Sequence, residues 1–182
     1  MGDDGVVSGL DAGAVHVSTS TISPGLGRAL AEAHAARGRA YVASPVLGRP
    51  EAAGRGELTL LLGGDDAAIA QAQPALRAMG RAQLRVGDAF QAQLTKLIAN
   101  FLIAGTIELV AEATALGEKG GIAPADLVRA LSATVVGSPA LESYGARIAA
   151  AAYQPAGFTA PLGLKDVELA PKRLQLVDGG GA

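Results

Sequence analysis

The pattern of hydrophobic and polar positions changes near residue 88. Before that point short apolar runs alternate with alanine-rich stretches, and after it apolar residues recur at three- and four-residue steps. The first pattern is typical of short strands alternating with helices, and the second of long helices. The chain is therefore expected to be α/β over residues 1–88 and all-α over residues 89–182.

Three short apolar runs in the first part have the composition of strands. They span residues 14–19, 40–43 and 57–62, and a Gly-Gly-Asp-Asp turn at residues 63–66 closes the third. Because helical stretches and short glycine-containing links separate these runs, we expect a partly parallel sheet with covering helices.

Capping signals mark two helices in this part. Ser23 can cap the first helix, Pro24 suits its first turn, and Gly38 ends it. Asp66 can cap the second helix, which runs through residue 79 and ends at Gly80. One helix is thus expected after the first strand and another after the third.

A single long helix dominates the second part. Its apolar pattern runs over residues 89–117, a length of roughly 40 Å at the standard helical rise, and Gly120-Gly121 stops it. Asn100, Glu108 and Glu112 interrupt its most apolar stretch, so we expect a buried helix and not a membrane span. Shorter helices are predicted at residues 125–134, at 139–152 and from about Leu162, with Pro171 kinking or stopping the last.

Composition excludes several classes of function. The 182 residues include 15 basic and 17 acidic side chains, a net charge of -2, so no nucleic-acid or anionic-membrane partner is expected. The absence of cysteine excludes thiolate catalysis and disulfides, and two histidines are too few for a histidine-rich metal site. No secretory signal pattern is visible, and we expect a cytoplasmic protein.

The two histidines and the paired aspartates have ordinary structural explanations. His16 lies inside the first strand pattern and is expected to be a core or edge residue. His34 lies among alanines on a helix face and is expected to be solvated. Asp65 and Asp66 follow two glycines and suit turn and helix-cap chemistry better than a metal site.

Lys96 and Asn100 are the candidate reactive pair of the long helix. Their spacing of four places them one turn apart on one face, among mostly apolar neighbours. A lysine there loses water and gains a lowered pKa, which suits a proton donor or acceptor. The alternative is a lysine that snorkels to the surface beside an asparagine bonded to nearby backbone. Spacing alone leaves both interpretations open.

Four segments occur in a fixed order along nearly the whole chain. They are Ser20-Thr21-Ile22-Ser23-Pro24, Ala43-Ser44-Pro45-Val46-Leu47-Gly48-Arg49, Lys96 with Asn100, and Lys165-Asp166 preceded by Phe158. In that order they resemble motifs of the β-hydroxyacid dehydrogenase family, NAD(P)-dependent oxidoreductases of the 3-hydroxyisobutyrate dehydrogenase and glyoxylate reductase type. The corresponding family motifs are Ser-Thr-x-x-Pro, a substrate loop Asp-Ala-Pro-Val-Ser-Gly-Gly, a catalytic lysine with its amide, and a C-terminal Lys-Asp pair.

The resemblance implies an architecture and a set of partners. Residues 1–88 are expected to form the C-terminal part of a Rossmann-like nucleotide-binding domain. A long interdomain helix and an incomplete helical substrate and dimerisation domain are expected over residues 89–182. NADP or NAD is the implied cofactor, with NADP slightly favoured, and the implied partners are a small-molecule substrate and a second copy of the chain.

The resemblance also implies residue roles. Lys96 is expected to be the general acid/base for hydride transfer between nicotinamide and a small hydroxyacid or carbonyl compound, with Asn100 orienting the substrate. Asp166 is equally well explained as a salt-bridge partner, and Arg49 as a solvated surface residue. The implied substrate-binding residues are Pro45, Val46, Leu47, Gly48 and Arg49, and the implied cofactor-binding residues are Ser20, Thr21, Lys165 and Asp166.

Two departures from the family pattern change these expectations. No Gly-x-Gly-x-x-Gly follows a first strand, so we expect an internal or truncated fragment that by itself binds dinucleotide poorly. Leu47 stands where the family usually has a serine that binds the substrate carboxylate, and the loop around it resembles that of imine reductases. The lysine at position 96 instead favours the dehydrogenases, so the substrate stays open.

A second class of function rests on the length of the helix. A helix of roughly 40 Å with apolar residues around much of its surface exceeds what this short chain can cover. A non-catalytic helical association module would form a stable dimer without binding nicotinamide.

Overall fold

The structure, a computed structural model, describes residues 5–156 and 159–169. It comprises two compact units, the first with described residues 5–98 and 164–169, the second with residues 99–156 and 159–163. The division falls inside helix α5 (Ala89–Lys119). The assignment of residues 1–88 and 89–182 as separate domains stays a prediction.

The first unit contains a mixed five-stranded sheet. Its central strand β4 pairs in antiparallel fashion with β2 and β3 and in parallel with β5, and β1 pairs in parallel with β2. This confirms the predicted Rossmann-like α/β part and its partly parallel sheet, whereas β3 and β5 were not expected. The strands are β1 (Val15–Ser18), β2 (Ala40–Ala43), β3 (Val46–Leu47), β4 (Leu58–Gly64) and β5 (Gly80–Gly87).

Strands β2 and β3 run along β4 one after the other. Ala43 is opposite Gly63 in β4, and Val46 is opposite Leu60. Between them Pro45 cannot donate a ladder hydrogen bond because it has no N–H, but its carbonyl oxygen accepts one from Leu61 at 3.0 Å. One extended run is therefore divided at Ser44-Pro45.

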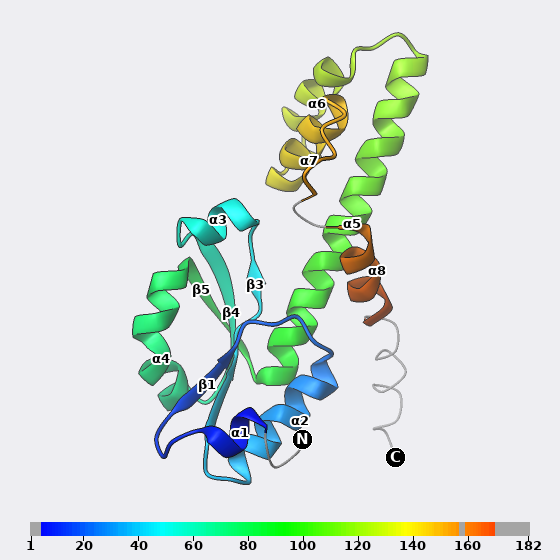
Figure 1. Ribbon diagram of the computed structural model, residues 1–182. Helices are drawn as coiled ribbons and strands as arrows, with labels where there is room; N and C mark the ends of the chain where they lie inside the picture. The colour runs from blue at the N-terminus through cyan, green and yellow to red at the C-terminus, as the bar shows by residue number, and fades with distance from the viewer. Residues whose placement is uncertain (1–4, 157–158, 170–182) are drawn as a thin grey trace. The chain divides into compact units, whose positions relative to one another are not determined.

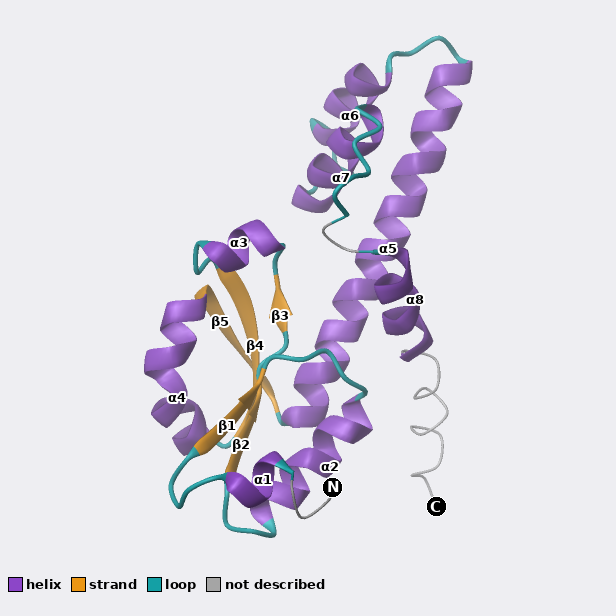
Figure 2. Cartoon of the chain, viewed as in Figure 1, coloured by secondary structure: helices purple, strands orange, loops and turns teal. Residues whose placement is uncertain are grey.

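Helices cover both faces of the sheet. Val42 and Leu60 face α4 (Asp66–Met79), where Ile69 and Leu76 complete an apolar cluster. The neighbouring Tyr41 and Ala43 face the opposite side, because successive side chains of a strand alternate. That side is covered by α2 (Pro24–Ala35) and the first turns of α5, as Figures 1 and 2 show. Two further short helices are α1 (Val6–Gly9) and α3 (Pro50–Gly54).

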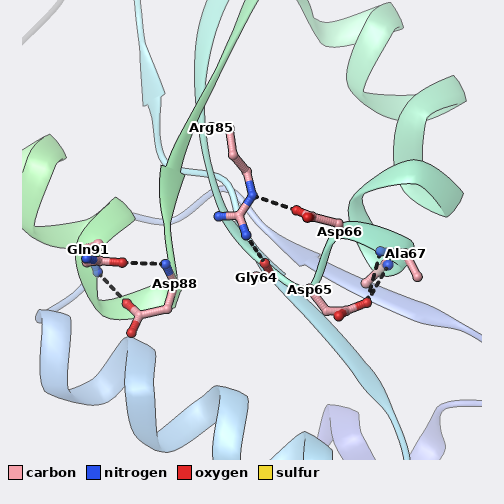
Figure 3. Close-up of polar contacts among 8 residues, drawn as sticks. Gly64, Asp65, Asp66, Ala67, Arg85, Asp88 and Gln91 are labelled. Atoms are coloured by element: carbon pink, nitrogen blue, oxygen red, sulfur yellow. Dashed lines mark hydrogen bonds and ion pairs between the residues drawn. The ribbon is translucent and has the colours of Figure 1, made fainter.

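The helix caps follow the predicted residue types with one correction. Ser23 Oγ accepts from the Leu26 amide at 3.2 Å, as expected. The cap of α4 is Asp65, not Asp66, and its carboxylate accepts from the amides of residues 67 and 68 at 2.9 and 3.2 Å (Figure 3). Asp66 occupies the first helical position and pairs with Arg85 of β5 at 2.9 Å.

Helix α5 begins with a reciprocal cap. The Gln91 side chain accepts from the Asp88 amide, and the Asp88 carboxylate accepts from the Gln91 amide, both at 2.8 Å (Figure 3). The helix ends at Lys119, where the Ile122 amide donates to the Gly117 oxygen at 2.9 Å and Gly121 has φ +81°. The predicted stop at Gly120-Gly121 is therefore confirmed.

In the second unit, α6 (Pro124–Ser132) and α7 (Pro139–Ala149) pack on α5. Val110, Val128 and Leu141, one from each helix, form the buried cluster. Gly145 permits this packing, since a Cβ there would lie 2.8 Å from the Val128 side chain. With α8 (Ala160–Leu169), this confirms the three predicted shorter helices, while Pro171 lies outside the described residues.

The expectation that α5 is buried is wrong. Its most apolar window has the length and hydropathy of a membrane span, yet only 17% of that window is buried within the chain. Asn100 is 6% exposed, whereas Leu109 and Leu116 are each 72% exposed. Val110 is buried against α6 and α7 in the second unit, Ala89 and Ala92 are buried in the first unit, and Phe101, Leu102, Leu109 and Leu116 are exposed within the chain.

Candidate functional site

The carboxyl ends of β1 and β2 lie side by side. The strands are parallel, and the Ser44 amide donates to the Ser18 oxygen at 2.7 Å just beyond them. Two predicted site segments therefore begin at the same edge: the one at Ser20 leaves the sheet, and the one at Pro45 continues along β4 as β3. Ligands of open α/β sheets bind at such carboxyl edges.

The segment after β1 is held by a side chain that the sequence did not single out. Gln93 of α5 is fully buried; its Nε2 donates to the Ser20 oxygen at 2.9 Å, and its Oε1 accepts from the Ile22 amide at 3.1 Å. In the sequence, Gln93 stands out only as a polar residue at a helical position that faces apolar neighbours, three residues before Lys96.

Lys165 contacts the same segment from α8. Its Nζ donates to the Thr21 oxygen at 3.2 Å and lies 2.9 Å from the Asp166 carboxylate. Asp166 is 4% exposed, so the carboxylate is one of the few buried charges of the described chain. Thr21, Lys165 and Asp166 thus come together within the first unit.

Lys96 lies on α5 in the same unit and is partly buried. Burial lowers its pKa below the ordinary value because the charged ammonium loses water; Asp166 opposes this shift and Lys165 adds to it. Asn100 lies one turn further along α5 and is buried. The desolvated amine and the lysine that snorkels to the surface both stay predictions for Lys96.

The remaining predicted substrate residues are built into the edge of the sheet. Pro45 is buried, and Val46 and Leu47 form β3 instead of a loop, paired with β4. Gly48 has φ +143°, and a Cβ there would lie 2.6 Å from the Leu58 side chain, so the turn itself requires glycine. Arg49 is partly buried at the N-terminal cap of α3. Phe158 lies outside the described residues.

The two histidines form an unexpected pair. His16 Nδ1 lies 2.9 Å from His34 Nε2, and His34 Nδ1 lies 2.7 Å from the Leu30 oxygen. Both rings pack on Tyr41, with centroid separations of 5.2 and 4.9 Å. The expected solvation of His34 is wrong, because it is 2% exposed; α2 packs this face on the sheet.

This arrangement combines a lysine amine that can exchange a proton with a backbone segment whose position is fixed. A desolvated lysine amine can exchange a proton at a pH where an ordinary lysine stays charged. In the same unit, Gln93 and Lys165 fix the backbone of residues 20–22. Within the described part of the chain, no group of three or more His, Asp or Glu side chains is suited to a metal ion.

Two known sequence families together match almost the whole chain. Residues 1–92 match the NAD binding domain of 6-phosphogluconate dehydrogenase. Residues 91–178 match the NAD-binding domain described for NADP-dependent 3-hydroxyisobutyrate dehydrogenase.

Individual relatives agree with these families. An uncharacterized oxidoreductase of Bacillus subtilis, YfjR, is 37% identical over 171 residues, covering 93% of this chain and 59% of its own length. A 3-hydroxyisobutyrate dehydrogenase of Pseudomonas aeruginosa is 34% identical over 183 residues, covering 97% of this chain and 61% of its own. The chain thus spans about three fifths of the length of the curated relatives it matches.

Solved structures share the fold. A 3-hydroxyisobutyrate dehydrogenase of Salmonella typhimurium superposes with a TM-score of 0.84 at 25% identity, covering 96% of this chain and 61% of that chain. An imine reductase of Streptomyces aurantiacus gives 0.60 at 25% identity, over 83% and 52% of the two chains. The order of motifs from Ser20 to Asp166 and these matches agree that the chain belongs to the family of NAD(P)-dependent oxidoreductases related to 3-hydroxyisobutyrate dehydrogenase.

Proposed function

We propose that this chain carries the proton-transfer part of an NAD(P)-dependent oxidoreductase acting on a small hydroxyacid or the corresponding carbonyl compound. The observation that carries the proposal is the partly buried Lys96, whose pKa is lowered by burial. It lies on α5 in the same unit as the anchored Ser20–Ile22 segment. Family membership supports the redox chemistry, and the lysine supports the role of general acid/base.

The lysine meets a defined chemical need. Addition of hydride to a carbonyl carbon develops negative charge on the oxygen, and an ammonium close to that oxygen stabilises and protonates it. In the reverse direction, the neutral amine accepts the hydroxyl proton. A lowered pKa makes both protonation states of Lys96 accessible nearer to neutrality. Asn100, one turn away, is proposed to orient the substrate oxygen.

Ser20, Thr21 and Lys165 are proposed to hold the nicotinamide cofactor, which supplies or accepts the hydride when bound. Their fit rests on the position of residues 20–22 just beyond the carboxyl end of β1 and on the backbone bonds that fix them there. Asp166 is proposed to keep Lys165 in place through their ion pair. We favour NADP over NAD, as one of the matched families is described as NADP-dependent.

The substrate class is proposed from the β3 edge. Pro45, Val46, Leu47, Gly48 and Arg49 would line the substrate side. The leucine at position 47 offers no hydrogen bond to a carboxylate, whereas the Arg49 guanidinium can pair with one. A hydroxyacid substrate is therefore favoured if Arg49 binds its carboxylate, and an imine is the alternative if it does not.

The test is a titration of the purified chain with NADPH and NADH, followed by nicotinamide fluorescence. Because the chain has no Gly-x-Gly-x-x-Gly after a first strand, we expect weak but saturable binding in the wild type and in Lys96→Ala, with turnover of small hydroxyacids or aldehydes lowered in the variant by about 10²-fold or more. Lys119→Ala, an exposed lysine at the end of the same helix, is the matched control. A folded wild-type protein that binds neither nucleotide would reject the proposal.

A second role is supported by the outward face of α5. Phe101, Leu102, Leu109 and Leu116 are between 57% and 72% exposed. Such a run of exposed apolar side chains on one helix is typical of an association surface. A homodimer formed through α5 is compatible with catalysis. In the alternative of a non-catalytic helical association module, forming this dimer is the whole function.

A further inference from the structure

Gln93 is fully buried on α5, and its side chain joins this helix to the segment that follows β1. We infer that Gln93 is a positioning residue that locks the backbone on both sides of Thr21 onto the helix that carries Lys96. The inference rests on the proposed function for the roles of Thr21 and Lys96. Gln93 itself is assigned no contact with substrate or cofactor.

The two hydrogen bonds fix the orientation of the Gln93 amide. The Ser20 carbonyl can only accept, so it needs the Nε2 donor, and the Ile22 amide can only donate, so it needs the Oε1 acceptor. A carboxylate has no donor for Ser20, and an apolar side chain has neither group. Asparagine carries both groups but is shorter by one methylene. Glutamine therefore matches this position in chemistry and in reach.

Close packing of α2 keeps the amide in place. A Cβ at Gly27 would lie 3.1 Å from both the Ala89 oxygen and the Gln93 Cγ, closer than ordinary contacts. The glycine thus lets α2 approach the Gln93 side chain closely and restricts its rotation. A buried amide that is hydrogen-bonded through both its nitrogen and its oxygen specifies one arrangement of the segments that it joins.

The bonds of Gln93 set the position of Thr21 relative to the lysine. Gln93 and Lys96 are three residues apart on a rigid helix, so they lie on neighbouring parts of one side. Among the described residues, Lys165 also makes a polar contact with this segment, and its side chain is 45% exposed. Loss of the buried bonds would leave Thr21 held mainly by this exposed contact.

The test replaces Gln93 with methionine, which is close in volume and length but makes neither bond. We expect the Ile22 amide to exchange with solvent at least about tenfold faster, the KM for the nicotinamide cofactor to rise and kcat to fall. Gln91→Met is the matched control: it removes a polar bond at the start of the same helix and leaves Ser20 and Ile22 untouched. The control should keep the wild-type exchange rate at Ile22 and the wild-type kinetics.

Gln93→Glu provides a rescue that a purely packing role would not predict. Its side chain can accept from the Ile22 amide in either protonation state, and only the protonated form can donate to Ser20, so Ile22 protection should recover at least in part relative to Gln93→Met. The inference would be overturned if the Ile22 amide exchanged in Gln93→Met at the wild-type rate. It would also be overturned if that amide exchanged faster in Gln93→Met but KM and kcat equalled those of Gln91→Met. If the wild type neither binds nucleotide nor turns over, the proposed function fails and the positioning role with it. In that case the exchange comparison still decides whether the two bonds exist.

Discussion

At the scale of single residues, Lys96 is the group whose protonation should control the reaction. Its pKa is lowered mainly by burial, so the ammonium is lost at a lower pH than for an exposed lysine. The rate of carbonyl reduction should therefore fall as pH rises through this lowered pKa, because the acid form is needed. The rate of alcohol oxidation should rise over the same range. Steady-state kcat/KM profiles in both directions measure this.

Lys96→Arg separates proton transfer from positive charge. Arginine keeps the charge but does not release its proton in this pH range. We expect nucleotide binding to persist, oxidation to fall by about 10²-fold, and the pH dependence to disappear. Lys119→Arg should behave as the wild type. A Lys96→Arg variant that retains the wild-type pH profile would assign the titration to another group.

The histidine pair should make the stability of the first unit depend on pH. Burial and the neighbouring His34 lower the pKa of His16 below its usual 6.5. A group with a lowered folded-state pKa binds protons more readily in the unfolded chain, so acid favours unfolding. Its stabilisation is complete above pH 6.5 and is lost as pH falls from there through the folded-state pKa. Urea unfolding at pH 7.5 and pH 5.5 should show this decrease.

His16→Gln is the comparison for that experiment. It removes the titrating ring from β1 and leaves the surface carboxylates unchanged. The variant should lose less free energy of unfolding than the wild type between the two pH values. Equal losses in both proteins would mean that carboxylates, and not this pair, determine the pH dependence.

At the scale of secondary-structure elements, two adjacent aspartates differ sharply in their contribution to α4. Asp65 accepts from two backbone amides, whereas Asp66 makes a surface ion pair with Arg85. Asp65→Ala should lower the free energy of unfolding by about 1 kcal/mol, and Asp66→Ala by less than about 0.5 kcal/mol. Chemical denaturation of the two variants measures which loss of free energy of unfolding is larger. A larger loss for Asp66→Ala would mean that Asp66, and not Asp65, caps the helix.

The elements that sequence predicted well have strong local signals. Residues 40–43 form β2 as expected, and Ser23-Pro24 opens α2. β5 was not expected, although Arg81, Gln83 and Arg85 alternate with Ala82, Leu84 and Val86 in the period-two pattern of a half-buried strand; it pairs with β4. β3 has only two residues and depends on the same neighbour. A strand as short as β3 is determined by contacts that a local pattern does not contain.

In the candidate site too, residues with a local sequence signal were predicted, and residues defined by distant contacts were not. Lys96 stood out as a charged residue in an apolar helix, and Thr21 and Lys165 through a resemblance of motifs. Gln93 and His34 did not, because each is defined by a partner elsewhere in the chain. Gln93 is bonded to the residues after β1, and His34 to His16. Burial of a polar side chain is a three-dimensional property.

At the scale of the whole molecule, the exposed apolar positions of α5 predict self-association. Leu109→Lys with Leu116→Lys places two charges on positions that are each 72% exposed within one chain. If these positions meet a second copy, the double variant should be monomeric at concentrations where the wild type is a dimer. Light scattering coupled to size-exclusion chromatography measures this.

Val135→Lys is the control for association. Val135 is fully exposed and lies between α6 and α7. This variant should keep the wild-type mass at every concentration. A wild type that is monomeric throughout would remove α5 as a dimer interface, and the double variant should then show no change.

The sequence separation of contacting residues has a consequence for folding during synthesis on the ribosome. Each described strand of the sheet pairs with strands close to it in sequence, and all the described pairings lie within residues 15–87. The paired residues are 25 positions or fewer apart, so all these pairings can form before residue 165 has been synthesised. The bond from Lys165 to Thr21 instead spans 144 residues. The nascent chain should therefore acquire its sheet well before it can complete the surroundings of Lys96, and interrupted synthesis would leave a folded but unfinished site.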